Sequence, residues 1–224
     1  VYTRLDSGIF LDGMDFHKWI GYCYGDPIED KFVLMRTEDY GKSWHNVDKG
    51  ILPMAMAKEA GFAASGTGIL FTEKMRFVAT GGDSVARIMR TFLGQEEWEF
   101  FDTPIRSGEG CGIFSMCLGH RTIVAVGGCY LDSTNNLANC AISKDGGKSW
   151  KLINESAPRG YRSCVAYAEA VAFLIACGRT GIDISYDYGQ SWKPLSNEGY
   201  YVCALAESTG WLMGKRGKMA QITW

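Results

Sequence analysis

Residues Ser143–Lys151 read SKDGGKSWK, and the same pattern returns at two other places in the chain. Thr37–Trp44 reads TEDYGKSW and Ser185–Trp192 reads SYDYGQSW, so all three stretches follow Ser/Thr-x-Asp-x-Gly-x-Ser-Trp. A degenerate copy, TFLGQEEW, occupies Thr91–Trp98. Recurrence at roughly 40 to 55 residues is typical of a structural repeat. We therefore interpret the stretch as a unit of repeating architecture.

Two of these copies contain Gly-Lys-Ser, which also occurs in nucleotide-binding P-loops of the form Gly-x-x-x-x-Gly-Lys-Ser/Thr. The position of the first glycine is taken by Ile142 in one copy and by Arg36 in the other. A P-loop is also a single element between a strand and a helix, not a repeat. The pattern therefore excludes this kind of phosphate site.

Each copy lies in the same context. Two apolar segments precede it, a third leads into the motif, and a fourth begins at its Trp; Thr122–Gly128 (TIVAVGG) and Phe173–Gly178 (FLIACG) are examples of the second segment. Short strands at regular spacing, grouped in fours, are typical of propeller blades. The sequence predicts an all-β propeller with blades at residues 8–48, 60–101, 111–153, 160–195 and 199–224. We expect residues 1–6 to supply the strand that closes the ring.

The motif falls on the hairpin between the third and fourth strands. There an Asp can accept backbone N–H bonds across the turn, a Gly can adopt positive φ, and a Trp can pack back onto the blade. We expect these structural roles, and no catalytic role, for Asp39, Gly41, Trp44, Asp145, Gly147, Trp150, Asp187, Gly189 and Trp192.

The composition is that of an ordinary globular chain. It has 224 residues, 46% of them hydrophobic and 21% charged, with a net charge of −2. A near-neutral charge argues against nucleic-acid binding. No apolar run approaches the roughly 18 residues that span a bilayer. The chain begins at Val1 with no signal-peptide pattern, so we expect a processed or truncated start and, in that case, more than five blades.

The chain has eight cysteines. Five lie within apolar segments, where a free thiol behaves as a small buried hydrophobe: Cys23, Cys117, Cys164, Cys177 and Cys203. The candidate disulfide joins Cys129 to Cys140, because this pair flanks a loop between two adjacent strands.

The motifs resemble the Asp-box (BNR) repeats of sialidase-like propellers. Longer strings, GFAASGT, TPIRSGEGCGIFSMCL, GYRSCVAY and GRTGIDISYDYGQSW, resemble the photosystem II stability/assembly-factor-like family across nearly the whole chain. The resemblance implies an exported (secreted) protein, in an extracytoplasmic space or organelle lumen, that scaffolds or binds another protein. It defines no reaction, and a shared fold does not supply one.

Motifs of known chemistry are missing. No Phe/Tyr-Arg-Ile-Pro segment supplies the first arginine of a sialidase, since TPIR at residues 103–106 has another order. No Cys-x-x-Cys occurs, and His17, His45 and His120 are isolated, so we expect no metal and no cofactor. A nucleophilic triad stays open, because its residues meet in space and not in sequence.

In a four-stranded meander, the loops that lead into first strands and the turns between second and third strands lie at one end. These loops are the candidate binding face. Its acidic candidates come mainly from the first two blades: Asp12, Asp26, Glu59, Asp83 and Glu109. Its basic candidates come from the later blades: Arg106, Arg159, Arg162, Arg179, Lys215 and Arg216. Arg87 and Asp183 lie just inside third strands. The alternatives are that loop charges are simply solvated, and that Arg162 and Asp183 form a buried pair.

We therefore expect a non-catalytic protein-binding or assembly-factor-like propeller, whose partner is another protein or a peptide segment, with a glycan also possible. The alternatives are a sialidase-like glycan-active hydrolase and a structural subunit of a larger complex.

Overall fold

A computed structural model describes residues 8–95 and 97–224. The described chain forms five antiparallel sheets, each a meander in which consecutive strands pair. This confirms the all-β propeller architecture predicted from the repeats. Its helices are 3₁₀ turns of three residues each, and none in the described part is long and apolar enough to cross a membrane.

The strands have the following bounds in chain order. The first sheet contains β1 Leu11–His17, β2 Ile20–Ile28, β3 Lys31–Thr37 and β4 His45–Asn46. The second contains β5 Ile69–Phe71, β6 Met75–Ala79, β7 Arg87–Phe92 and β8 Glu99–Asp102. The third contains β9 Cys111–Gly119, β10 Thr122–Cys129, β11 Cys140–Ser143 and β12 Lys151–Leu152. The fourth contains β13 Cys164–Ala168, β14 Phe173–Gly178, β15 Gly181–Ser185 and β16 Lys193–Ser196. The fifth contains β17 Val202–Leu205, β18 Thr209–Met213 and β19 Met219–Thr223. The 3₁₀ turns are η1 Lys49–Ile51, η2 Tyr130–Asp132, η3 Glu169–Val171 and η4 Lys215–Gly217.

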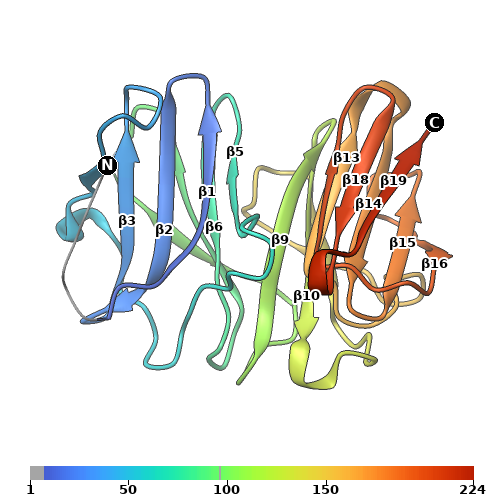
Figure 1. The fold of residues 1–224 in the computed structure, drawn as a ribbon. Coiled ribbons are helices and arrows are strands. Elements are labelled where there is room, and N and C mark those ends of the chain that lie inside the picture. Colours follow the sequence, from blue (N-terminus) through green and yellow to red (C-terminus); the bar gives the residue numbers. More distant parts are fainter. Residues whose placement is uncertain (1–7, 96) are drawn as a thin grey trace.

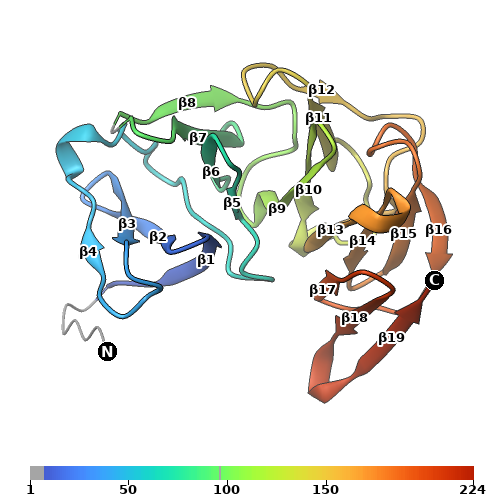
Figure 2. The same ribbon diagram turned by 90° about the horizontal axis from the view of Figure 1, so that it is seen from above.

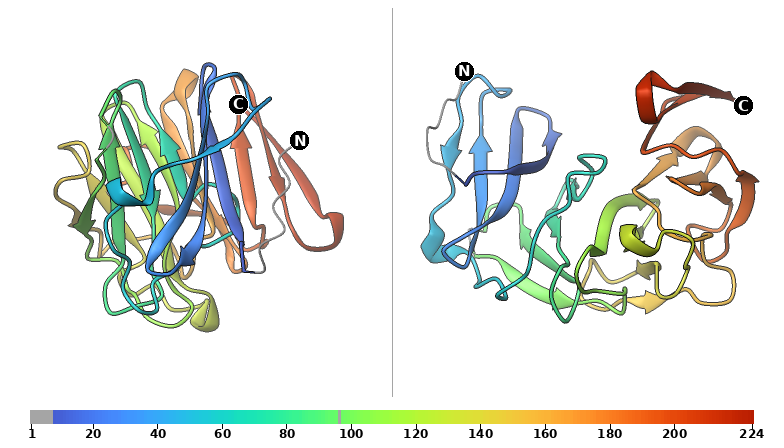
Figure 3. Two further views of the ribbon diagram at one scale, coloured as in Figure 1. Left: turned by 90° about the vertical axis from the view of Figure 1, so that its left-hand side faces the viewer. Right: turned by 60° about the horizontal axis from the view of Figure 1, so that its bottom comes forward.

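The sheets stand side by side around an axis, as Figure 1 shows from the side. Seen from above, they follow an arc from β1–β4 at one end to β17–β19 at the other (Figure 2). The first strand of each sheet contacts the first strand of the next, so these strands line the inside of the arc. The further views in Figure 3 show the same succession. The predicted ring closure by residues 1–6 lies outside the described residues.

The hydrophobic core lies between neighbouring sheets, and strand alternation divides it. On β10, Ile123 and Ala125 belong to the cluster shared with the second sheet. Val124 and Val126 belong to the cluster shared with the fourth sheet. Successive side chains of a strand point to opposite faces, so a strand buried on both faces serves two interfaces at once. The side chains of β14 likewise alternate between the cluster shared with the third sheet and the cluster shared with the fifth sheet.

The Asp-box hairpins are hydrogen-bonded units. Asp187 Oδ1 accepts from Ser185 Oγ at 2.8 Å and from the Ser191 N–H at 2.8 Å, while Ser191 Oγ donates to Oδ2 at 2.6 Å. Gly189, at φ +85°, donates its N–H to Ser185 Oγ, and Trp192 Nε1 donates to the Gly189 carbonyl. The other two boxes repeat the bonds to the carboxylate. The repeated motif is thus a repeated turn.

Two strands begin later than the sequence suggests. The fourth blade was predicted to begin at residue 160, but its first strand, β13, begins at Cys164. In the second sheet β5 begins at Ile69, and residues 61–67 form an irregular loop. Both displaced segments lie at the same end of the molecule, where they form the site described next.

Candidate functional site

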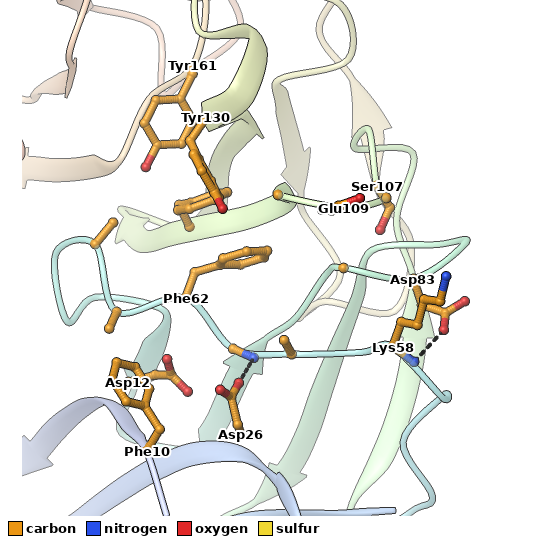
Figure 4. A pocket seen from close by; sticks show the side chains of 18 of the residues that line it. Phe10, Asp12, Asp26, Lys58, Phe62, Asp83, Ser107, Glu109, Tyr130 and Tyr161 are labelled. Carbon is orange, nitrogen blue, oxygen red and sulfur yellow. Dashed lines mark hydrogen bonds between the residues drawn. The ribbon is translucent and has the colours of Figure 1, made fainter. Parts of the chain in front are cut away.

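Along the axis around which the sheets stand, the molecule has two ends, and they differ in the segments that they present. The Asp-box hairpins form one end, here the box end. The loops leading into the first strands and the turns between second and third strands form the other, here the loop end (Figure 1). A cavity of about 1080 Å³ opens among the loops of the loop end. It is lined by residues from all five sheets or the loops before them, and we name it the loop-end cavity (Figure 4).

The inner part of the loop-end cavity is aromatic. The rings of Phe62 and Phe114 stack with centroids 4.0 Å apart, and Tyr161 meets Phe114 edge-on at 4.7 Å. Tyr130 approaches Phe114 edge-on at 6.4 Å. A Cβ at Gly112 would come within 2.6 Å of the Phe62 ring, so the glycine lets that ring lie against the backbone. Such offset and edge-on arrangements are the favourable geometries of aromatic pairs.

Phe114 reaches this position through a β-bulge. Strands β9 and β10 pair at Ile113–Gly127 and at Ser115–Val126, which leaves Phe114 as the extra residue of β9. A bulge re-aims the side chain that it carries.

Asp12 is also the extra residue of a bulge. Strands β1 and β2 pair at Leu11–Gly25 and then at Gly13–Tyr24. Asp12 is only 4% exposed, and neither of its carboxylate oxygens has a hydrogen-bond partner in the part of the chain that the structure describes.

A third bulge carries Asp26. Strands β2 and β3 pair at Gly25–Val33 and then at Pro27–Phe32, so Asp26 is the extra residue of β2. Its N–H donates to the Phe10 carbonyl at 3.1 Å, which fixes this part of β2 against the segment before β1.

The two carboxylates converge on Gly61, in the loop before β5. The Gly61 N–H donates to Asp26 Oδ1 at 3.0 Å, and a Cβ at Gly61 would lie 2.3 Å from Asp12 Oδ2. Figure 4 shows both side chains at this corner of the loop-end cavity. Burial, reinforced by the charge of Asp26, raises the pKa of Asp12 to about 7. The corner therefore holds concentrated negative charge in a poorly solvated place.

The remaining charged groups lie along the rim. Asp83 accepts the N–H of Ser84 at 2.6 Å and that of Lys58 at 2.8 Å, and these bonds lower the pKa of Asp83. Arg179 donates to the Tyr130 carbonyl, which places a guanidinium on the opposite side from the acidic corner. Four carboxylates line the loop-end cavity, against the cations of Lys58 and Arg179: Asp12, Asp26, Asp83 and Glu109.

Two of the predicted binding residues are buried instead. Arg162 and Asp183 are 0% and 1% exposed and form an ion pair. Arg162 also donates to the Tyr161 carbonyl and to Thr180 Oγ1, and Arg159 Nε donates to Asp183 Oδ1 at 2.9 Å. Buried charges are stable only when paired in this way. Neither side chain can meet a ligand directly, so the buried-pair alternative describes them.

Three further predicted arginines lie outside the loop-end cavity. Arg87 pairs with the fully buried Glu59, and its guanidinium carbon lies 3.5 Å from the centre of the Phe100 ring. Arg106 pairs with Asp132 at 3.1 Å. Arg216 is exposed in η4. Among the described residues, Arg179 is thus the one basic candidate that lines the loop-end cavity. The acidic candidates Asp12 and Asp26 also line it.

The disulfide expected between Cys129 and Cys140 was wrong. Cys129 is bonded to Cys111, its direct cross-strand neighbour on β9, and Cys140 is a free buried thiol. The sequence places Cys140 near Cys129 along the chain, but the strand register places Cys111 opposite it. The bond ties together the two segments that carry Gly110 and Tyr130 into the loop-end cavity.

The aromatic lining was missed from the sequence. Tyr200 is buried in the core between the fourth and fifth sheets. Its neighbour Tyr201 lines the loop-end cavity, as do Phe10 and Phe62. One signal was present: the family-like strings GFAASGT and GYRSCVAY contribute Gly61–Ala64 and Tyr161 to the lining.

No metal site emerges from the described residues, in which no three His, Cys, Asp or Glu side chains are grouped so as to hold an ion.

Comparison with known proteins agrees with this architecture. The BNR/Asp-box repeat family matches residues 141–152, while no curated protein matches the sequence. The structure of YCF48 bound to D1 peptide is similar with a TM-score of 0.63 at 16% identity, covering 98% of this chain and 65% of that one. The GH74 xyloglucanase of Xanthomonas campestris gives a TM-score of 0.61 at 16% identity, covering 96% of this chain and 36% of that one. YCF48 from Cyanidioschyzon merolae gives 0.55 at 11% identity, covering 98% and 73%. This chain thus spans less than two thirds of the first two structures, and at such identities the likeness concerns the fold.

Proposed function

We propose that this Asp-box β-propeller is a non-catalytic binding module that holds a segment of another protein in the loop-end cavity. The observation that carries the proposal is the cavity itself. At about 1080 Å³ it is at the upper limit of small-molecule sites, and its aromatic floor and charged rim match the composition of protein-recognition surfaces. The fold likeness to a propeller solved with a bound peptide supports this choice.

The test is selection of binders from a random peptide library, followed by affinity measurement on variants. Phe62→Ala and Tyr130→Ala remove aromatic area from the loop-end cavity. Each substitution is expected to lower the affinity for the selected peptides about tenfold or more. Tyr186→Ala is the matched control, since it removes an exposed aromatic ring at the box end. Peptides that bind all three variants as tightly as the wild type would refute the proposal, as would a library that yields no binder.

A glycan-active hydrolase is the second candidate, and the acidic corner favours it. Two neighbouring carboxylates, one of them with its pKa raised to about 7, are what glycoside hydrolysis uses as acid and base. Turnover of aryl glycosides by the wild type, abolished in Asp12→Asn, would favour this function over peptide binding.

The structural-subunit alternative rests on the fifth sheet. Leu212 of β18 is buried against the fourth sheet, so its neighbours Trp211 and Met213 lie on the opposite, exposed face, 42% and 48% accessible. Association that survives the loop-end variants but is lost in Trp211→Asp would place the interface there.

We also propose that the protein works outside the reducing cytoplasm. The Cys111–Cys129 disulfide supports this location, because structural disulfides persist in oxidising compartments.

A further inference from the structure

The acidic corner formed by Asp12 and Asp26 has charge that the described chain does not balance. A buried carboxylate normally has hydrogen-bond donors or a cation beside it. Asp12 has neither: its two oxygens accept no hydrogen bond, and no Lys, Arg or His among the described residues forms an ion pair with it. The other buried carboxylates, Glu59 and Asp183, are each paired with arginine. Asp12 is thus the exception.

The neighbouring group makes the imbalance larger. Asp26 uses Oδ1 to accept the Gly61 N–H and adds a second negative charge that acts on Asp12. Both residues line the loop-end cavity. The Asp12 oxygens are buried in its wall, so a group that enters meets Asp26 first and reaches Asp12 through a local shift of that wall.

The walls of the corner are apolar. Phe10, 57% exposed, and Phe62 both line the cavity beside the acidic pair (Figure 4). The ring of Tyr24 lies behind it, since a Cβ at Gly61 would come within 2.9 Å of that ring as well as of Asp12. An aliphatic stem with a cationic head fits such walls, because the stem packs on the rings while the head meets the carboxylates.

We propose that the Asp12–Asp26 corner receives a lysine or arginine side chain of the bound segment; this rests on the proposed function and names the residue type that the site selects. A cationic head supplies the donors that Asp12 lacks, in charge-assisted hydrogen bonds. A metal ion is a poorer occupant, because no third protein carboxylate, His or Cys joins the two in the described chain. An anionic side chain would meet repulsion at this corner.

The proposal has a pH signature. The pKa of Asp12 is raised to about 7 in the free protein, and a bound cation lowers it. Binding therefore takes a proton from Asp12 below neutral pH, and affinity rises as the pH increases from about 5 to 8. Asp26, Lys58 and Arg179 are other charged groups of the same cavity, so the Asp12→Asn variant is needed to assign the effect.

The experiment uses the selected peptides and a small probe. N-acetyl-lysinamide and its neutral match N-acetyl-norleucinamide are titrated at millimolar concentration into protein carrying ¹³C-labelled aspartate. Only the lysine probe is expected to shift the Asp12 carboxyl signal and lower its titration midpoint. In a selected peptide, replacing the basic residue by norleucine is expected to cost about tenfold in affinity for the wild type and less than about twofold for Asp12→Asn. Asp102→Asn, an equal charge change at an exposed position of β8 outside the cavity, is the control and should retain the tenfold preference.

The outcomes separate the inference from the function. Selected peptides without a basic residue, or an equal response to both probes, overturn the inference and leave peptide binding intact. A library without binders overturns the proposed function, and the inference falls with it. An Asp12→Asn protein that keeps the tenfold preference also overturns the inference, because the cation then lies elsewhere.

Discussion

At the residue scale, Asp12 combines deep burial with the absence of a hydrogen-bond or ion-pair partner among residues 8–95 and 97–224. Its pKa is raised to about 7 from 3.8, so folding shifts Asp12 toward the protonated form at any pH between these two values. For an acid with a raised pKa, stability is highest below the unfolded value and declines as pH rises toward the folded value. The ionised Asp12 therefore opposes folding at neutral pH, which is typical of groups kept for binding at the expense of stability.

Asp12→Asn is therefore expected to stabilise the protein above neutral pH. The gain should be on the order of 1–3 kcal/mol at pH 8, after allowance for solvent screening, and should shrink toward zero near pH 4. Urea unfolding at both pH values measures it. Asp83→Asn should bring no gain, because hydrogen bonds hold the pKa of Asp83 low. An Asp12→Asn protein less stable than wild type at pH 8 would mean that the carboxylate is satisfied in the free protein.

Arg162 and Asp183 show the opposite arrangement at the same scale. Their charges are as deeply buried as that of Asp12, but Asp183 accepts from two arginines and Arg162 donates to three acceptors. A pair of this kind fixes the loops around it and leaves no capacity for a ligand. Partner count, not residue type, separates these structural charges from Asp12, for which we propose a binding role.

At the element scale, the Asp-box hairpin is a turn closed by side chains. In the third sheet, the hydroxyl and N–H of Ser149 lower the pKa of Asp145 to about 2. A lowered pKa stabilises the fold above about pH 4, and the contribution is lost as pH falls toward 2. The box therefore works in its ionised form at every physiological pH.

Asp187→Ala removes the acceptor of three hydrogen bonds in the fourth sheet. We expect it to lower the free energy of unfolding by about 1–2 kcal/mol, because the Ser191 N–H loses its partner. Lys193→Ala, at an exposed position of β16 in the same hairpin, is the control and should change the free energy of unfolding by less than about 0.5 kcal/mol. Denaturant titration with unchanged peptide binding would confirm a purely structural box. Equal effects of the two substitutions would contradict it.

At the scale of the whole molecule, the sheets hold one another through clusters of aliphatic and aromatic side chains. Leu174 of β14 is fully buried in the cluster between the third and fourth sheets, whereas Leu195 of β16 is 47% exposed. Burial between sheets, and not within one sheet, supplies most of the hydrophobic stabilisation of such an array.

Leu174→Ala is expected to cost about 2–5 kcal/mol of unfolding free energy, since it leaves a cavity between two sheets. Leu195→Ala removes the same atoms from an exposed position and should cost less than about 0.5 kcal/mol. Calorimetry of both variants makes the comparison. Similar melting temperatures for the two would show that the interface between these sheets contributes little to stability.

The sequence alone determined the class of fold and which loops lie together at each end of the propeller. The period of the Asp boxes predicts four-stranded units, and the order of strands within a unit decides which loops share an end. These features are local: the hydrogen bonds of a box join residues at most four apart, so its letters suffice. Asp12, Asp26 and Arg179 could be placed near the site for the same reason.

The tertiary structure decided which of those residues line the loop-end cavity. Asp12, Asp26 and Phe114 enter the loop-end cavity from β-bulges, and Cys129 finds Cys111 through the register of β9 with β10. A bulge or a register depends on the partner strand and on packing against the next sheet, so no local pattern specifies it. Burial of an arginine beside a carboxylate is equally non-local. The repeats thus determined the fold, and strand pairing decided that Asp12 is buried without a partner among the described residues.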